Sequence, residues 1–210
     1  MKVREEDIQI KLPRDPTRSS GLHLSTIIRD LALKTGVLDS KWDFPIEEGD
    51  TTLAAVGMAW EDWLAKHTPE LEFHPGELHL DGIAMSPDGI IAVELEDGRV
   101  EWVLVEIKST LKSSRDFREL LKLGAKKVLQ YLWQVKSYRY ALNKLFAEHK
   151  SNLAQIWILF LRSDYNRNWD ESPPMQFKIF HLEFSDEELE VNWGMITSHA
   201  EIEVEEDEGY

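Results

Sequence analysis

The sequence has no cysteine among its 210 residues. Disulfides, zinc-thiolate sites and cysteine-ligated iron-sulfur clusters are therefore excluded, and any bound metal must be held by oxygen or histidine nitrogen. The chain also lacks an apolar run of the ~18 residues that a membrane span needs, and its opening, MKVREEDIQIKLPRDP, lacks the apolar centre of a signal peptide. We therefore expect a soluble, cytoplasmic protein with no membrane partner.

Positive charge is scarce, with 24 Lys and Arg against 39 Asp and Glu and a formal net charge of -15. A chain of this charge repels phosphate, which argues against a nucleic-acid partner. The cations are nevertheless concentrated, because residues 108–150 contain 11 Lys and Arg against 3 Asp and Glu. This basic segment leaves two interpretations open: a solvated helix face, or a surface that faces an anion.

The chain divides into three parts by composition. Residues 1–18, with two prolines and mixed charge, are expected to be an N-terminal arm, and residues 19–200 are long enough for one domain with a sizeable core. Residues 201–210 contain six acids and are expected to be a solvated or disordered tail, which could dock a protein partner.

The hydrophobic periodicity of the domain predicts helices and strands of an α/β (α+β) fold. A three-stranded meander is expected between Glu77 and Lys108, punctuated at Pro87-Asp88-Gly89 and at Asp97-Gly98. The other expected elements are helices in 19–36, 49–70 and 117–149, the last with a break at Gly124, and strands in 152–162 and 175–184.

Asp97-Gly98 lies between two alternating runs and predicts a tight hairpin. A two-residue turn there would set Asp88 opposite Ile107 and so beside Glu106. Strand side chains alternate between faces, so Glu106 and Lys108 share a face. Asp81 is the alternative acid, but a chain reversal at Pro87-Asp88 would pair it near the far end of the meander.

Glu106 and Lys108 interrupt the apolar run Trp102-Val-Leu-Val-Glu-Ile-Lys, where unpaired charges are costly. A buried salt bridge is one interpretation, although it does not explain Asp88 beside it. The other is a hard divalent ion, Mg²⁺ or Mn²⁺, that relieves the repulsion between Asp88 and Glu106, with Lys108 helping to orient or deprotonate a water. This is phosphodiester hydrolysis chemistry, and the basic segment would then line the path of a nucleic-acid backbone.

Pro87-Asp88 and Glu106-Ile107-Lys108 resemble the PD-(D/E)XK motif of the metal-dependent nuclease superfamily. The order of elements is similar to its restriction-endonuclease-like αβββαβ core, a central mixed sheet flanked by helices. SPDGII and LVEIKST resemble the lambda exonuclease and RecB-like branch, and the absence of cysteine excludes the branch with an iron-sulfur cluster. The resemblance covers roughly residues 21–161. A separation of 18 residues from Asp88 to Glu106 is longer than in compact members, which keeps Asp81 as an alternative ligand.

Two helix motifs extend the resemblance. Gly57 followed by Glu61 resembles that branch's upstream motif, and Gln134 followed by Tyr138 resembles its downstream Gln-xxx-Tyr motif. The resemblance implies that the metal ligands are Asp88, Glu106, the main-chain carbonyl of Ile107 and Glu61, with Lys108 catalytic beside them. It implies a supporting or DNA-binding role for Gln134 and Tyr138. From the basic segment, we expect a supporting or DNA-binding role for Lys112, Arg115, Lys126 and Lys127.

The function implied is that of a Mg²⁺-dependent (or Mn²⁺-dependent) deoxyribonuclease, an exonuclease of recombination, repair or phage DNA metabolism. DNA is the implied partner, and the family includes both oligomeric rings and monomers. Two alternatives stay open: a non-catalytic DNA-binding or scaffold protein on a nuclease fold, and a structure-specific endonuclease. Strand polarity and the choice between single-stranded and double-stranded substrates do not follow from the residues.

Overall fold

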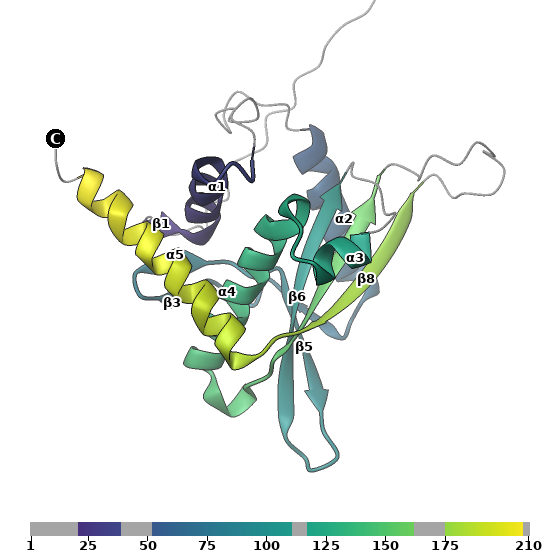
Figure 1. Cartoon of the computed structure of the whole chain (residues 1–210). Helices are drawn as coiled ribbons and strands as arrows, with labels where there is room; N and C mark the ends of the chain where they lie inside the picture. The colour runs from purple at the N-terminus through teal and green to yellow at the C-terminus, as the bar shows by residue number, and fades with distance from the viewer. Residues whose placement is uncertain (1–20, 39–51, 111–116, 162–174, 208–210) are drawn as a thin grey trace, which may run out of the picture.

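The structure is a computed structural model that describes residues 21–38, 52–110, 117–161 and 175–207. Its centre is a mixed five-stranded sheet in the order β2-β5-β6-β7-β8 (Figure 1). Only the β6–β7 pair is parallel among these strands. Their bounds are Leu71–Phe73 (β2), Gly89–Glu94 (β5), Val100–Thr110 (β6), Leu153–Phe160 (β7) and Gln176–Glu183 (β8). The predicted α/β class with a mixed sheet flanked by helices is confirmed.

The predicted meander of residues 77–108 is wrong in its first part. β3 (Leu78–Leu80) and β4 (Ile83–Met85) pair in a separate three-stranded sheet with β1 (Leu22–His23). β2 takes their expected place, because it pairs with β5 at Phe73 and Gly89. A Cβ at Gly89 would lie 2.6 Å from Leu71 Cδ1, so β2 packs where only glycine leaves room. β4 and β5 do not pair with each other, so Pro87-Asp88 is a passage between two sheets and not a hairpin turn.

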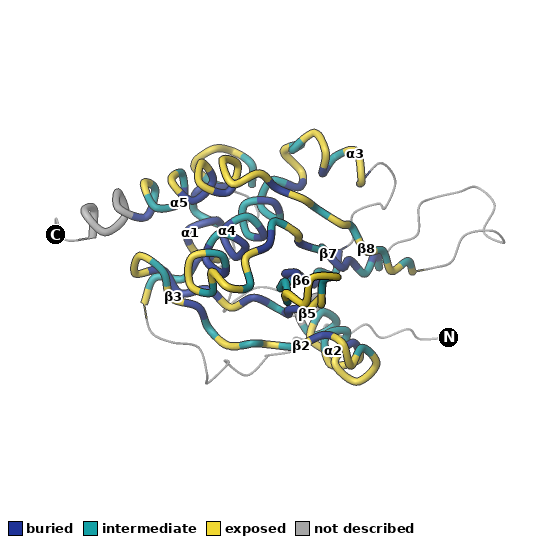
Figure 2. Tube along the Cα trace, turned by 90° about the horizontal axis from the view of Figure 1, so that it is seen from below, coloured by how far each residue is buried: buried dark blue, intermediate teal, exposed yellow. Residues whose placement is uncertain are grey.

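Helices cover both faces of the central sheet, as Figure 2 shows. α4 (Leu129–Leu145), α1 (Leu24–Lys34) and α5 (Asp186–Asp207) lie on one side, and α2 (Thr52–His67) lies on the other. The main core under α4 includes Leu104 and Ile156, each at 0% exposure. A smaller core under α2 contains Leu64, Leu71, Val105, Ile107 and Trp157. Successive side chains of β6 therefore alternate between the main core under α4 and the smaller core under α2.

The expected helix over 117–149 is interrupted where predicted. α3 (Phe117–Lys122) ends before Gly124, which has φ 55, and a short 3-10 turn, η2 (Lys126–Val128), leads into α4. A second 3-10 turn, η3 (Ala147–His149), follows α4. Val128, Leu132, Val135, Tyr138 and Leu142 are all buried, as their helical spacing predicts.

α5 was not expected from the sequence. Leu189, Trp193, Ile196 and Ala200 are buried at helical spacing against α1 and α4. The backbone of α5 continues through 201–207, into the segment expected to be an acidic tail. None of the described helices is both long and apolar enough to cross a membrane.

Candidate active site

The hairpin between β5 and β6 sets the geometry of the site. Its loop is the three residues Glu96-Asp97-Gly98: Gly98, with φ 80, donates its N–H to the Leu95 carbonyl at 2.9 Å. A three-residue loop with glycine in the left-handed region replaces the expected two-residue turn. The register therefore shifts by one residue, and Gly89 pairs with Val105. Asp88, just before β5, still comes to lie beside Glu106 and Ile107.

Asp88 is held against β6 by its own carboxylate. Its Oδ2 accepts a hydrogen bond from the Ile107 N–H at 2.7 Å, and Asp88 is half-buried. Its main-chain carbonyl accepts the His74 N–H at 3.0 Å, which ties Asp88 to the end of β2 as well. Asp88, just before β5, is thus held against β6 and the end of β2 by hydrogen bonds from main-chain N–H groups.

Glu106 and Lys108 point from β6 to the face under α4. Lys108 Nζ donates to Glu106 Oε1, so the predicted ion pair is present, with Glu106 at 0% and Lys108 at 24% side-chain exposure. The other carboxylate oxygen, Glu106 Oε2, is buried and has no hydrogen-bond partner in the part of the chain that the structure describes. A buried carboxylate oxygen without a donor is costly, so the salt bridge alone leaves Glu106 incompletely satisfied.

The site holds more acid than base. Burial and then the charge of Asp88 raise the pKa of Glu106 to about 8, against the opposing charge of Lys108. Burial lowers the pKa of Lys108, but the charges of Glu106 and Asp88 outweigh burial and hold it above its ordinary value. Lys108 therefore stays protonated over the physiological range, and Glu106 is the group that a cation would keep ionised.

Glu61 approaches the same site from α2, on the other side of the sheet. It is half-buried, and burial and then the charge of Asp88 raise its pKa above the ordinary value. Gly57, one turn earlier, lets α2 come close to β6, because a Cβ there would lie 3.3 Å from Ser109 Oγ. The spacing between Gly57 and Glu61 thus brings the acid over the end of β6.

Gln134 and Tyr138 line the α4 side of the site. Gln134 Nε2 donates to the Tyr138 hydroxyl at 3.0 Å, and Tyr138 is 4% exposed. Burial and then the charge of Glu106 raise the pKa of Tyr138 above its ordinary value. Gln134 therefore orients a buried hydroxyl that lies within electrostatic reach of Glu106 and Lys108.

The remaining predicted residues are not gathered here. Asp81, with φ 51, accepts a hydrogen bond from Trp193 Nε1 at 2.8 Å in the turn between β3 and β4. β4 separates Asp81 from Asp88, so the structure does not bring the alternative ligand to Glu106. Lys126 and Lys127 are exposed on η2. Lys112 and Arg115 lie outside the described residues.

His74 is a neighbour of the site that the sequence reasoning left aside. Its charge lowers the pKa of Glu61. Its main-chain N–H, in a residue with φ 47, donates a hydrogen bond to the Asp88 carbonyl. No ligand-like spacing marks His74 in the sequence. Only the pairing of β2 with β5, three residues long, brings it here.

The donor atoms fit a hard divalent cation. Glu61, Asp88 and Glu106 offer carboxylate oxygens, the donors that Mg²⁺ and Mn²⁺ prefer, and Glu106 Oε2 lacks any other partner. Among the described residues no three acidic or histidine side chains already stand in a ligand cluster. Glu106 is turned to Lys108 and Asp88 to the Ile107 N–H, so cation binding would require the carboxylates to reorient.

Comparisons with known proteins give structural likenesses only. No protein-family model matches the chain, and the search of curated proteins gave no match. Its structure is similar to the alkaline exonuclease LHK-Exo of Laribacter hongkongensis, with TM-score 0.42 and 16% identity over 90% of this chain and 91% of that one. It is also similar to a phage related exonuclease from Haemophilus somnus 129PT, with TM-score 0.43 and 15% identity over 84% of this chain and 78% of that one. The roles of individual residues rest on the geometry above.

Proposed function

We propose that the chain is a divalent-metal-dependent nuclease that hydrolyses phosphodiester bonds in DNA. The observation that carries the proposal is the buried Glu106 Oε2, which has no hydrogen-bond partner among the described residues although Lys108 and Asp88 lie beside it. An orphaned carboxylate oxygen in an acid-rich site, next to a lysine that stays charged, suits a cation and a phosphate together.

Each side chain has a role in this proposal. Glu106, Asp88 and Glu61 would hold Mg²⁺ or Mn²⁺, with the Ile107 carbonyl as a further ligand. When bound, the ion would supply positive charge at the phosphate and lower the pKa of a water. Lys108 would hold a non-bridging phosphate oxygen and stabilise the charge that develops there. Tyr138, oriented by Gln134, would support Lys108 from the α4 side.

We further propose that the enzyme is an exonuclease of recombination, repair or phage DNA metabolism. This finer assignment rests on the sequence resemblance to the lambda exonuclease and RecB-like branch. Substrate topology tests it directly, because an exonuclease needs a strand end and an endonuclease does not.

The test is digestion of matched linear and circular DNA, single-stranded and double-stranded, in Mg²⁺, Mn²⁺ or EDTA. We expect linear DNA to be lost with metal and not with EDTA, and circles to survive. Lys108→Ala should be inactive, and Lys66→Ala, a control at an exposed α2 position outside the basic segment, should cut like the wild type. Nicking of circles would make the protein an endonuclease. Binding without cleavage in any metal would make it a scaffold.

A further inference from the structure

A basic cavity lies on the far flank of α4 from the acid-rich candidate active site. A cavity of about 720 Å³ opens between α3, α4, β8 and the start of α5. Leu132 and Lys136 of α4 line it, whereas Gln134 and Tyr138 face the active site. Residues two positions apart on an α-helix, such as Leu132 and Gln134, point about 200° apart around its axis, so α4 lies between the two sites. The volume is that of a small-molecule pocket, too small for a duplex.

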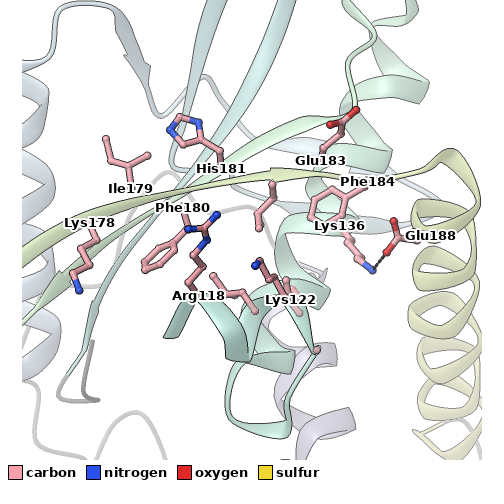
Figure 3. A pocket seen from close by; sticks show the side chains of 14 residues that line it. Arg118, Lys122, Lys136, Lys178, Ile179, Phe180, His181, Glu183, Phe184 and Glu188 are labelled. Carbon is pink, nitrogen blue, oxygen red and sulfur yellow. Dashed lines mark hydrogen bonds and ion pairs between the residues drawn. The ribbon is translucent and has the colours of Figure 1, made fainter. Parts of the chain in front are cut away.

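The side of β8 that faces the cavity is basic over an apolar floor (Figure 3). Lys178 and Phe180 point from β8 toward the side of α3, where Arg118 and Lys122 lie, while His181 and Glu183 point to the other side of the strand. Leu121, Leu132 and Phe184 form buried parts of the floor.

The charges around the cavity differ in how far they are already paired. Lys136 binds Glu188 at 3.1 Å, and Lys122 binds Glu119 at 3.0 Å. Arg118 is exposed and makes no hydrogen bond or ion pair within the described part of the chain. On a chain of net charge -15, an arginine without a counter-ion above an apolar floor favours an anion with an apolar body.

The sheet register links this cavity to Lys108. Lys108 pairs with Ile158, and Ile158 pairs with Lys178, so the three residues form one row on the face under α4. Two interstrand spacings of ~4.8 Å put the Cα atoms of the two lysines about 10 Å apart. Ile158 between them is fully buried, so a ligand reaching both must run over the surface. A polymer with repeated phosphates meets that condition.

We infer that the cavity binds one nucleotide of an unpaired DNA strand whose scissile phosphate lies at Lys108. Arg118 and Lys178 hold its phosphate, and the base lies on the apolar floor. The inference rests on the proposed function for the position of the cut. It assigns the substrate class, a strand with an unpaired segment a few nucleotides from the scissile bond.

The test measures binding in EDTA, where cleavage does not interfere. The probes are a labelled dT 12-mer and a blunt 12-base-pair duplex, with free dTMP as competitor, titrated over a range of salt. The variant is Arg118→Gln/Lys178→Gln, which keeps long polar side chains. The matched two-charge control is Lys34→Gln/Lys66→Gln, at exposed positions outside both the cavity and the basic segment. Thermal melting checks that all the proteins are folded.

We expect the cavity variant to bind the 12-mer about tenfold more weakly than the wild type. Two lost phosphate contacts should reduce the slope of log affinity against log salt by about 1.4, at ~0.7 each on single strands. The control should stay within about twofold, and duplex binding should change less. Equal loss in the control, equal loss for the duplex, or unchanged 12-mer binding would each overturn the inference. Displacement of the 12-mer by micromolar dTMP would overturn the inference that the cavity binds a DNA strand, and would indicate that it binds a free nucleotide.

Failure of this inference is distinct from failure of the proposed nuclease activity. If the protein cuts DNA and the cavity variant binds the 12-mer normally, the proposed nuclease activity stands and the inference about the cavity is wrong. If the protein never cuts DNA, yet 12-mer binding is lost in that variant alone, the inference about the cavity stands and the proposed catalysis is wrong.

Discussion

Two cationic groups lie at β6 under α4, Lys108 half-buried and Arg139 fully buried, and their surroundings differ. Lys108 lies near one end with three carboxylates around it and an unpartnered oxygen on Glu106. The Arg139 guanidinium lies near the other end, at 0% exposure, and donates to the Trp102 carbonyl and to Asn143 Oδ1, the latter at 2.8 Å. Burial lowers the pKa of Arg139 to about 10, with only the charge of Glu101 opposing it.

The difference separates a structural cation from a chemical one. Neutral acceptors surround Arg139 and close its end of the sheet, although its Nε has no partner. Acids in excess surround Lys108, which keeps part of its side chain in solvent. Burial of charge alone therefore does not mark a functional site. Surplus charge of one sign with access to solvent is the better indicator.

The largest expected effect is on catalysis at the Lys108 end. Lys108→Ala should reduce metal-dependent cleavage by about 10³-fold, because the charge that stabilises the phosphate is lost. Stability should change little, since Glu106 can take up a proton in place of its ion pair. Cleavage rates and urea unfolding curves would measure both. Residual activity within tenfold of the wild type would contradict the role assigned to Lys108.

The next effect is on stability at the Arg139 end. Arg139→Ala should lower the free energy of unfolding by about 3 kcal/mol, because it leaves a cavity and strips donors from the Trp102 carbonyl and Asn143. Arg139→Met, which refills the volume, should lose less. Both variants should cut DNA at the wild-type rate at a temperature where they are folded. A catalytic defect in folded Arg139→Met would contradict the purely structural role assigned to Arg139.

The Lys108 end of β6 could largely be predicted from the sequence, because its arrangement depends on local patterns, whereas the role of Arg139 was not predicted. Alternation along β6 puts Glu106 and Lys108 on one face, and the Asp97-Gly98 signal brings Asp88 beside them even though the loop is one residue longer than expected. The placements of Glu61 and Gln134 follow from helix spacing once those helices are recognised.

The elements that could not be predicted depend on long-range pairing. β2 is three residues long, too short for a periodic signal, and its pairing with residues 89–91 of β5 defines it. The cavity joins α3 to Lys178, about 60 residues later, through the register of β7. α5 is different, because its signal was present: Ser185 and Glu188 form a reciprocal capping box, with bonds of 3.1 and 3.0 Å.

A smaller effect is expected from pH. Because the pKa of Glu106 is raised from 4.5 to about 8, the folded state holds a proton that the unfolded chain has lost within this window. In EDTA the stability should therefore fall as pH rises through it, by at most about 1.4 kcal/mol per pH unit. Urea unfolding at pH 6, 7 and 8 would measure the slope. Glu106→Gln should flatten it, and an unchanged slope in that variant would assign the titration to another group.

The smallest expected effect concerns the support of Lys108 from α4. Gln134→Ala removes the donor to the Tyr138 hydroxyl and leaves Tyr138 packed in the core, so the hydroxyl loses orientation without losing its place. We expect cleavage to fall by about threefold to tenfold, about 1 kcal/mol, with KM nearly unchanged because Gln134 is not assigned to the substrate. Gln134→Glu, whose carboxylate can accept a hydrogen bond from the Tyr138 hydroxyl, should restore orientation but add a fourth acid near Lys108. If Gln134→Ala raised KM and left kcat unchanged, Gln134 would contact DNA, and the active site would extend further along α4 than the Glu106–Lys108 pair indicates.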